Sequence, residues 1–413
     1  MKLIKNYYPP YILLTALYVF MIIFAFIVDS PIEIFYGLKE IILSPDILIT
    51  DYMAVGGIGA ALVNAALTSL LSMFLLISSG IKPNGSTLVS LWLMTGFSFL
   101  GKNIFNIWPI VLGVYLFSRV QKQAFLNYTL VALLGTSLAP IVSQLSFGGK
   151  LPTILGICLG LGIGVLVGFI LPPIAANSLK AHNGYNLYNI GFASGLVATL
   201  LMSIFRSLGI DFNSRLIWHT GSNLILFIFL TIICVTLIVV GIISSSDVKN
   251  KFIKLSNQSG RLVSDYYFLF GQVSYINMGL LGLLSTIFVV AIGADLNGAT
   301  ICGIFTIMGF GCFGKNIRNV TPVIIGASIA GILNIDPINS PSLVLSILFS
   351  TTLAPISGKF GWPYGVIAGI LHVNIVSNIG YLHGGLNLYN NGLAGGFVAM
   401  ILIPLITTFK KEH

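Results

Sequence analysis

A short polar motif stands twice in this chain, each time inside a long apolar run. The copies are Gly101-Lys102-Asn103 followed by Asn106 and Pro109, and Gly314-Lys315-Asn316 followed by Asn319 and Pro322. Lysine and asparagine side chains are costly to bury at membrane depth, so they occur there mainly for a function. A duplicated motif of this kind predicts a transport pathway at the interface of two repeated halves.

The composition around the motif places the chain in a membrane. Of its 413 residues, 56% are hydrophobic and 8% are charged, whereas soluble proteins carry about 25% charged residues. The net charge of +9 is attributed to basic residues near cytoplasmic helix ends, and no nucleic-acid partner is expected. The basic clusters predicted to be cytoplasmic are Lys2 and Lys5; Lys249, Lys251, Lys254 and Arg261; and Lys410 and Lys411.

A membrane-spanning helix needs about 20 apolar residues. The runs long enough to span are 11–28, 53–80, 124–146, 151–174, 185–205, 216–245, 264–293, 362–380 and 385–408. Shorter runs at 87–100, 104–120, 299–313, 320–333 and 342–356 flank the polar motifs. The short runs can be full crossings, half helices or re-entrant hairpins, so they leave the topology open.

Two further motifs recur in the same order as the first. Thr136-Ser137-Leu138-Ala139-Pro140-Ile141 returns as Thr351-Thr352-Leu353-Ala354-Pro355-Ile356, and the segment from His182 to Asn189 returns as His383 to Asn390. Three anchors in one order indicate an internal duplication. The chain is therefore predicted to be an all-α polytopic membrane protein with two homologous repeats, inverted by analogy with other transporters, and with broken or re-entrant helices.

The anchors divide the chain into five segments. Residues 50–208 form the first repeat and residues 263–413 the second. Residues 1–49 contain an extra helix and an amphipathic segment, and 209–245 contain another extra helix. Residues 246–262 are polar and basic, and they are expected to be the linker.

The Gly-Lys-Asn motif has two interpretations. Glycine and proline break a helix, and a broken backbone at membrane depth usually lines a cavity. The amides of Asn103, Asn106, Asn316 and Asn319 can then contact a neutral polar solute; alternatively, they only cap the broken helices. Lys102 and Lys315 either attract an anion or extend along lipid to the headgroups.

The other two motifs are assigned to the same pathway. Pro140 and Pro355 are expected to end half helices, a simple kink being the alternative. The third motif offers His182, Asn186, Tyr188 and Asn189, with His383, Asn387, Tyr389 and Asn390 in the second copy. The amides can face a solute, whereas the histidines and tyrosines can equally be interfacial anchors.

The remaining chemistry argues against catalysis and coupling. Asp51, Asp295 and Asp336 lie near the ends of apolar runs, and none is expected to be buried within a span. An ion-coupled carrier usually needs a buried carboxylate, so its absence favours a channel or uniporter. No nucleotide-binding, nucleophile or zinc motif occurs, so no enzyme, cofactor or metal site is expected.

The whole chain resembles an uncharacterised family of bacterial multispanning membrane proteins, a domain of unknown function, through its doubled motifs. Each repeat is also distantly similar to half of a urea transporter, because Tyr188-Asn189-Ile190-Gly191 and Tyr389-Asn390-Asn391-Gly392 match a Tyr-Asn-Gly segment of that family. The asparagine and proline that are adjacent in that family are separated here, and the two lysines have no counterpart. The resemblance implies an inverted-repeat fold, one pore per subunit, and a homo-oligomer such as a trimer in a bacterial cytoplasmic membrane.

The leading hypothesis is a channel or uniporter for a small polar solute, urea or a short amide, through a pore between the repeats of each subunit. The runner-up is a transporter of a small anion held by Lys102 and Lys315. The third hypothesis is a non-transporting membrane scaffold, which dry, filled space between the motifs would favour.

Overall fold

The computed structural model describes residues 9–261 and 264–409, and these residues form helices without a named strand. Among the described residues, nine helices are long and apolar enough to cross a membrane, so the protein is a multipass integral membrane protein. Lys2, Lys5, Lys410 and Lys411 lie outside the described residues. The run at 342–356, expected to be short, belongs to a continuous span over Pro341–Phe360.

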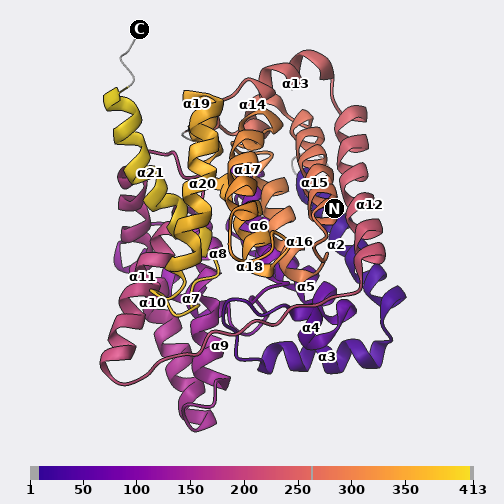
Figure 1. Ribbon diagram of the computed structural model, residues 1–413. Helices are drawn as coiled ribbons and strands as arrows, with labels where there is room; N and C mark the ends of the chain where they lie inside the picture. Colours follow the sequence, from indigo (N-terminus) through magenta and orange to yellow (C-terminus); the bar gives the residue numbers. More distant parts are fainter. Residues whose placement is uncertain (1–8, 262–263, 410–413) are drawn as a thin grey trace.

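The first half of the chain contributes the following helices: α2 (Pro9–Val28), α3 (Pro31–Leu43), α4 (Tyr52–Gly56), α5 (Ile58–Ser78), α6 (Gly85–Phe97), α7 (Trp108–Val120), η1 (Phe125–Asn127), α8 (Thr129–Gly135), η2 (Thr136–Leu138), α9 (Ala139–Phe147), α10 (Thr153–Ala181) and α11 (Asn189–Ser207). A loop over 208–222 then runs along one end of the molecule to α12 (Figure 1).

The second half repeats this order without a counterpart of η1: α12 (Asn223–Ile243), α13 (Val248–Ser256), α14 (Tyr266–Phe270), α15 (Val273–Ala291), α16 (Gly298–Phe310), α17 (Ile317–Ile332), α18 (Pro341–Ser350), η3 (Thr351–Leu353), α19 (Ala354–Phe360), α20 (Trp362–Ile379) and α21 (Asn390–Phe409). The predicted all-helical fold with two repeats is confirmed. The segments expected to lie outside the repeats, α2 and α12, occupy equivalent places, since α2 packs on α5 and α12 on α15.

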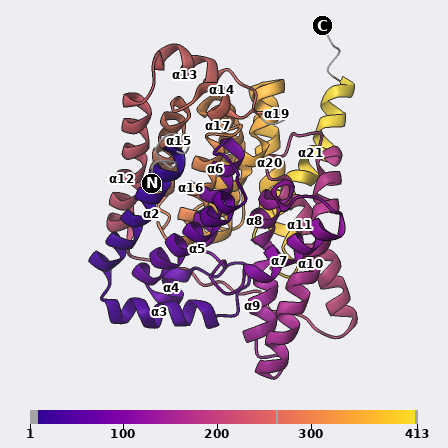
Figure 2. The same ribbon diagram turned by 180° about the vertical axis from the view of Figure 1, so that it is seen from behind.

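The repeats are inverted with respect to one another. Figure 1 shows α3 lying across the lower end of the molecule and its counterpart α13 across the upper end. Figure 2 shows the same arrangement from behind, with α2 and α12 side by side. The ring of Phe229 on α12 packs against Phe20 and Phe24 of α2, with ring centroids 5.8 and 5.1 Å apart.

The short runs around the polar motifs become short helices at the centre of the fold. Each of α6 and α16 has 13 residues, and the two pack against each other. Each begins with an asparagine that caps the helix, Asn84 or Asn297, in a reciprocal box with the threonine three residues later. These caps satisfy the first free backbone N–H groups, so the helices can begin inside the protein.

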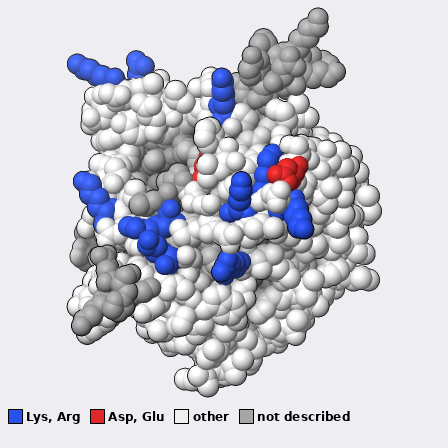
Figure 3. Space-filling view, turned by 90° about the horizontal axis from the view of Figure 1, so that it is seen from above, with Lys and Arg blue, Asp and Glu red and all other residues white. Residues whose placement is uncertain are grey.

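The upper end of the molecule is basic. Figure 3 shows lysine and arginine side chains spread over this face, with few acidic ones. Helix α13 lies here and carries Lys249, Lys251 and Lys254. The opposite end carries α3, whose exposed first turn holds Glu33, hydrogen-bonded to the backbone of Ser30. Hydrogen bonding to Ser30, through its side chain first and then its backbone, lowers the pKa of Glu33.

Candidate functional site

Both lysines of the duplicated motif are placed by a tight turn at the end of a central helix. Gly101 and Gly314 have φ values of 101° and 108°, a backbone region that side chains with a Cβ rarely adopt. The turn brings the N–H of Lys102 onto the carbonyl of Phe97 at 3.0 Å, and that of Lys315 onto Phe310 at 2.9 Å. The glycines therefore fix where each lysine leaves the helix.

Each lysine binds a tyrosine of the other repeat. The Nζ of Lys102 donates to the hydroxyl of Tyr389 at 2.9 Å, and the Nζ of Lys315 donates to that of Tyr188 at 2.6 Å. Both ammonium groups also lie over aromatic rings, 4.8 Å from the Tyr389 centroid and 4.6 Å from that of Tyr188. Neither lysine has any exposed surface, so the interpretation that they extend to the headgroups is wrong.

The two tyrosines reach the lysines because each third motif docks into the broken helix of the other repeat. The N–H of Leu187 donates to the carbonyl of Thr352 at 3.0 Å, and the N–H of Leu388 donates to that of Ser137 at 2.9 Å. These acceptors lie in η3 and η2, just before Pro355 and Pro140. Because a proline cannot donate to the turn before it, the helix break frees carbonyls that the other repeat then satisfies.

The asparagines of the third motif extend this exchange. Asn186 donates to the carbonyl of Gly392 at 2.9 Å, and Asn387 donates to that of Gly191 at 3.4 Å. The two glycines face each other, since a Cβ added to Gly191 would lie 3.2 Å from the Cα of Gly392. The first turns of α11 and α21 therefore cross in close contact at the centre of the molecule.

The histidines and the next asparagines close the docking loops. The Nε2 of His182 lies 3.0 Å from the Oδ1 of Asn189, and that of His383 lies 2.8 Å from Asn390. Each pair joins the end of one long helix to the start of the next. In this structure these residues hold the loop that carries Tyr188 or Tyr389.

The asparagines of the first motif bond to their own backbone and neighbours: Asn316 caps α17 in a box with Asn319, and Asn103 and Asn106 form the same box in the turn before α7. Asn103 and Asn106 each accept the backbone N–H of the other, and Asn316 and Asn319 do the same. The side-chain amide of Asn106 donates to Asp46, Gly101 and Ser143 at 2.9–3.1 Å. These side chains have partners within the protein, as the capping interpretation expected.

Sequence reasoning missed a buried carboxylate. Asp46 has no exposed surface and accepts the hydroxyl of Tyr52 at 2.8 Å, as well as the amide of Asn106. Burial raises the pKa of Asp46 to about 7, although these hydrogen bonds lower it. Asp51 is also fully buried, but it caps the short helix α4 and lies outside the candidate spans, as expected for an aspartate at the end of an apolar run. The sequence holds no signal for Asp46, because the residue lies in a polar loop outside all three motifs.

Asp51 and its counterpart Asp265 join the repeats at the outer ends of the central helices. The carboxylate of Asp265 accepts the N–H of Gly85, the first residue of α6, at 2.9 Å. Asp51 likewise accepts the N–H of Gly298, the first residue of α16. A carboxylate at a helix N-terminus is stabilised by the helix dipole, so each repeat anchors the central helix of the other.

Three cavities follow one another through the lysine–tyrosine centre. A cavity of about 680 Å³ near the lower end includes Phe349, Leu388 and Asn391 in its lining. These three residues also line a central space of about 10 Å³, together with Leu93 and the two tyrosines. Leu93 and the tyrosines in turn line an upper cavity of about 210 Å³. The central space holds about one water molecule, so the row of cavities is nearly closed between Tyr188 and Tyr389.

The outer cavities are equivalent positions of the two repeats. Leu187 and Asn189 line the upper one, and their counterparts Leu388 and Asn390 line the lower one. The lower cavity is more polar, because Asn391 and Ser346 stand where the first repeat has Ile190 and Val131. Arg206, Asp211 and Arg215 also line it.

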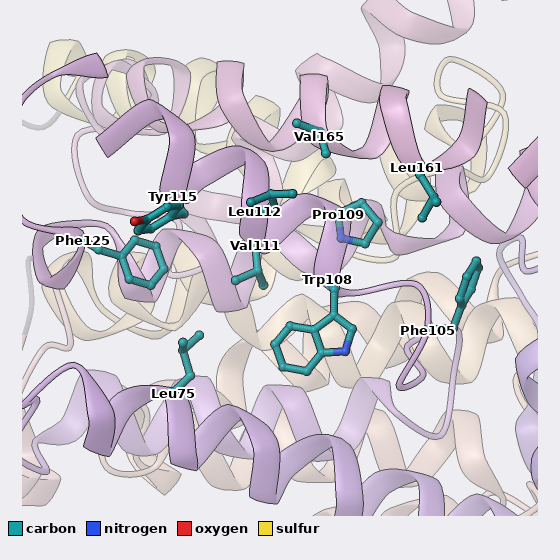
Figure 4. Close-up of a pocket in the computed structure, with 10 residues that line it drawn as sticks. All are labelled: Leu75, Phe105, Trp108, Pro109, Val111, Leu112, Tyr115, Phe125, Leu161 and Val165. Carbon is teal, nitrogen blue, oxygen red and sulfur yellow. The ribbon is translucent and has the colours of Figure 1, made fainter. Parts of the chain in front are cut away.

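A separate groove of about 680 Å³ lies on the side of the first repeat. Figure 4 shows its lining by apolar and aromatic side chains, including Trp108, Tyr115 and Phe125. Leu75 of α5 forms one wall, and Leu161 and Val165 of α10 form another. Trp108 and Tyr115 are 38% and 41% exposed. The groove shares no lining residue with the row of cavities, so it is not part of the site.

Comparison with known proteins assigns the chain to a family. The model of a family described as "Protein of unknown function (DUF1576)" matches residues 30–207 and 244–408. The two matched regions follow the two repeats, from α3 to α11 and from α13 to α21. No curated protein and no solved structure matches the chain.

Proposed function

Because this chain belongs to the DUF1576 family, a family of unknown function, we propose its function from its geometry. We infer that it is a channel or uniporter for a small polar solute, of the size of urea or a short amide, which passes between the two repeats of each subunit. The observation that carries the proposal is the row of three cavities through Tyr188 and Tyr389. If side chains had filled the space between the repeats, the non-transporting scaffold would have been the better interpretation.

The chemistry of the centre favours a solute that accepts hydrogen bonds. Each tyrosine oxygen accepts from a lysine ammonium, which leaves the tyrosine O–H as a donor polarised by the charge behind it. A carbonyl oxygen of urea or an amide is a suitable acceptor. Because the central space is about 10 Å³, passage requires the aromatic side chains around it to move apart.

A second candidate is a small anion. Lys102 and Lys315 are buried, and the one ion pair within 4.0 Å among the described residues, that of Arg206 with Asp211, involves neither lysine. Two buried ammonium groups without a carboxylate provide a positive environment that an anion can neutralise. This candidate shares the pathway of the first and differs in the charge of the solute.

The surroundings of the pathway follow from the same proposal. We place the protein in the cytoplasmic membrane of a bacterium, with the basic face of Figure 3 towards the cytoplasm. We also propose a homo-oligomer, such as a trimer, with one pathway per subunit, which is what a resemblance of the repeats to halves of urea transporters would imply.

The test is solute flux into liposomes that contain the purified protein. Wild-type protein should speed volume relaxation driven by urea, or by a permeant anion for the second candidate. Tyr188→Phe and Tyr389→Phe keep the rings and remove the hydroxyls, and each should slow the flux at least about tenfold. Tyr115→Phe, in the lateral groove, is the matched control and should leave it unchanged. Flux equal to that of protein-free liposomes for both solutes would refute the proposal.

A further inference from the structure

A fourth cavity, of about 230 Å³, opens on the basic upper end of the second repeat. It lies between the first turns of α17 and α20, the end of α19 and the segment that follows α13. It shares no lining residue with the row of cavities between the repeats. The proposed pathway therefore leaves this cavity unexplained.

The polar groups of this cavity are suited to a negative charge. Arg318 lines it and is exposed, with its Nη1 donating to the Oδ1 of Asn257 at 2.6 Å. Ser357 also lines it, is only 5% exposed, and its hydroxyl has no partner within the protein. Two helices of 16 and 18 residues, α17 and α20, begin at the cavity, and helix N-termini favour anions.

The first repeat shows what occupies the equivalent place when it is filled. There Asn103 and Asn106, the counterparts of Asn316 and Asn319, donate to the carboxylate of Asp46. The residue that matches Asp46 is Gly260, which has no side chain. In the second repeat, backbone carbonyls of Gln258 and Ser259 accept from the two asparagines instead. The first repeat therefore supplies a carboxyl group of its own to these asparagines, and the second does not.

The cavity exists because the second repeat lacks two features of the first. Helix α10 begins at Thr153, whereas α20 begins at Trp362, which matches Leu161 of α10, so the turns that cover this place in the first repeat are missing. In addition, Arg318 stands where the first repeat has Phe105, and Ser357 where it has Val142. Where the first repeat has apolar residues that fill this place, the second repeat has either empty space or a hydrogen-bond donor.

We propose that this cavity binds a phosphate group. The guanidinium of Arg318 presents a planar set of donors that matches phosphate oxygens, and the free hydroxyl of Ser357 and the two helix N-termini supply the others. The phosphate can come from a phospholipid headgroup, because basic pockets between membrane helices bind headgroups, or from solution.

Two binding measurements on the full-length protein in neutral detergent distinguish these sources. Titration calorimetry with inorganic phosphate reports a soluble ligand. Native mass spectrometry with phosphatidylglycerol, compared with phosphatidylcholine, reports a headgroup. Arg318→Phe and Ser357→Val introduce the residues of the first repeat and should each weaken whichever binding is found, by at least about tenfold for Arg318→Phe. Lys254→Gln, an exposed change on α13 of the same face, is the matched control.

The outcomes separate clearly. Binding of either probe that both variants weaken and Lys254→Gln preserves supports the site, and the probe that binds identifies the source. Circular dichroism and the thermal midpoint verify that the variants are folded, and Arg318→Gln replaces Arg318→Phe if the latter is not. Absence of binding for both probes, or binding that the variants leave unchanged, overturns the proposal. Solute flux plays no part in this test.

Discussion

The two repeats agree where they contact each other and differ where each contacts its surroundings. At the centre, each repeat provides a lysine after a glycine turn and a tyrosine that accepts from the other repeat's lysine. At the ends, the first repeat has Asp46 and a 29-residue α10, whereas the second has Gly260 and an 18-residue α20. Symmetry is maintained at the centre because a change in one repeat would unpair a group in the other.

The largest expected difference between the repeats is at Asp46. Removal of this acceptor in Asp46→Ala leaves the hydroxyl donor of Tyr52 buried without its acceptor and removes one of the three acceptors of the Asn106 amide. The loss should lower the free energy of unfolding by about 3 kcal/mol. In the second repeat the acceptor is the backbone carbonyl of Ser259. Ser259→Ala keeps this carbonyl and should therefore change the free energy of unfolding by less than about 0.5 kcal/mol. Thermal unfolding in detergent at pH 5 measures both. Equal effects would contradict the difference between the repeats.

The two lysines should be unequal, although they lie in equivalent places. Lys315 donates to two hydroxyls, those of Tyr188 and Thr351, at 2.6 and 2.7 Å. Lys102 donates to one hydroxyl and to the sulfur of Met94 at 3.6 Å, a weaker acceptor. Lys315→Met should therefore slow liposome flux by about tenfold and Lys102→Met by about threefold.

A reversed order of the two lysine variants would contradict the assignment of the stronger contact to Lys315. If the solute is an anion, both variants should abolish its flux and leave urea flux intact. The same pair of variants thus tests the inequality of the repeats and the charge of the solute.

The sequence predicts the repeats well because each carries three motifs with glycine, proline and asparagine in fixed order, and these residues determine where helices break. The partners of Lys102 and Lys315 could not be predicted, since each is a tyrosine in the other repeat and depends on how the halves dock. The role of Asn106 was open for a different reason: an amide can cap a helix or contact a solute equally well, and only its neighbours decide. Asp46 lies outside every motif, so its burial gives no sequence signal.

A pH-dependent stability should belong to the first repeat. Burial raises the pKa of Asp46 to about 7 from its ordinary value of 3.8. The folded state therefore binds more protons than the unfolded state between these values, and stability should fall as the pH rises from about 4 to 7. Asp46→Asn cannot ionise, so its thermal midpoint should fall less over this range. Part of the pH dependence should remain in this variant, because burial also raises the pKa of Asp51 to about 7.

The control for this dependence lies in the second repeat, where Gly260 matches Asp46 and provides no titrating group. Asn319→Asp would introduce a carboxyl near the same place, beside the carbonyl of Gly314. This variant should lose stability as the pH rises, because burial next to an acceptor favours the neutral form of the introduced carboxyl group. An unchanged pH profile in both variants would mean that the dependence arises elsewhere.

The smallest effect is expected at the rim of the lower cavity, where the repeats differ most in polarity. Asp211 is 58% exposed and pairs with Arg206 at 3.3 Å, and this pair lowers the pKa of Asp211. Any stability it contributes is present above the ordinary pKa of a carboxyl and is lost as the pH falls through the lowered value. Because solvent screens exposed pairs, Asp211→Asn should leave the thermal midpoint at pH 7 nearly unchanged and alter flux by less than about twofold. A larger loss of flux would mean that the charged rim, which the upper cavity lacks, selects the solute before it reaches the tyrosines.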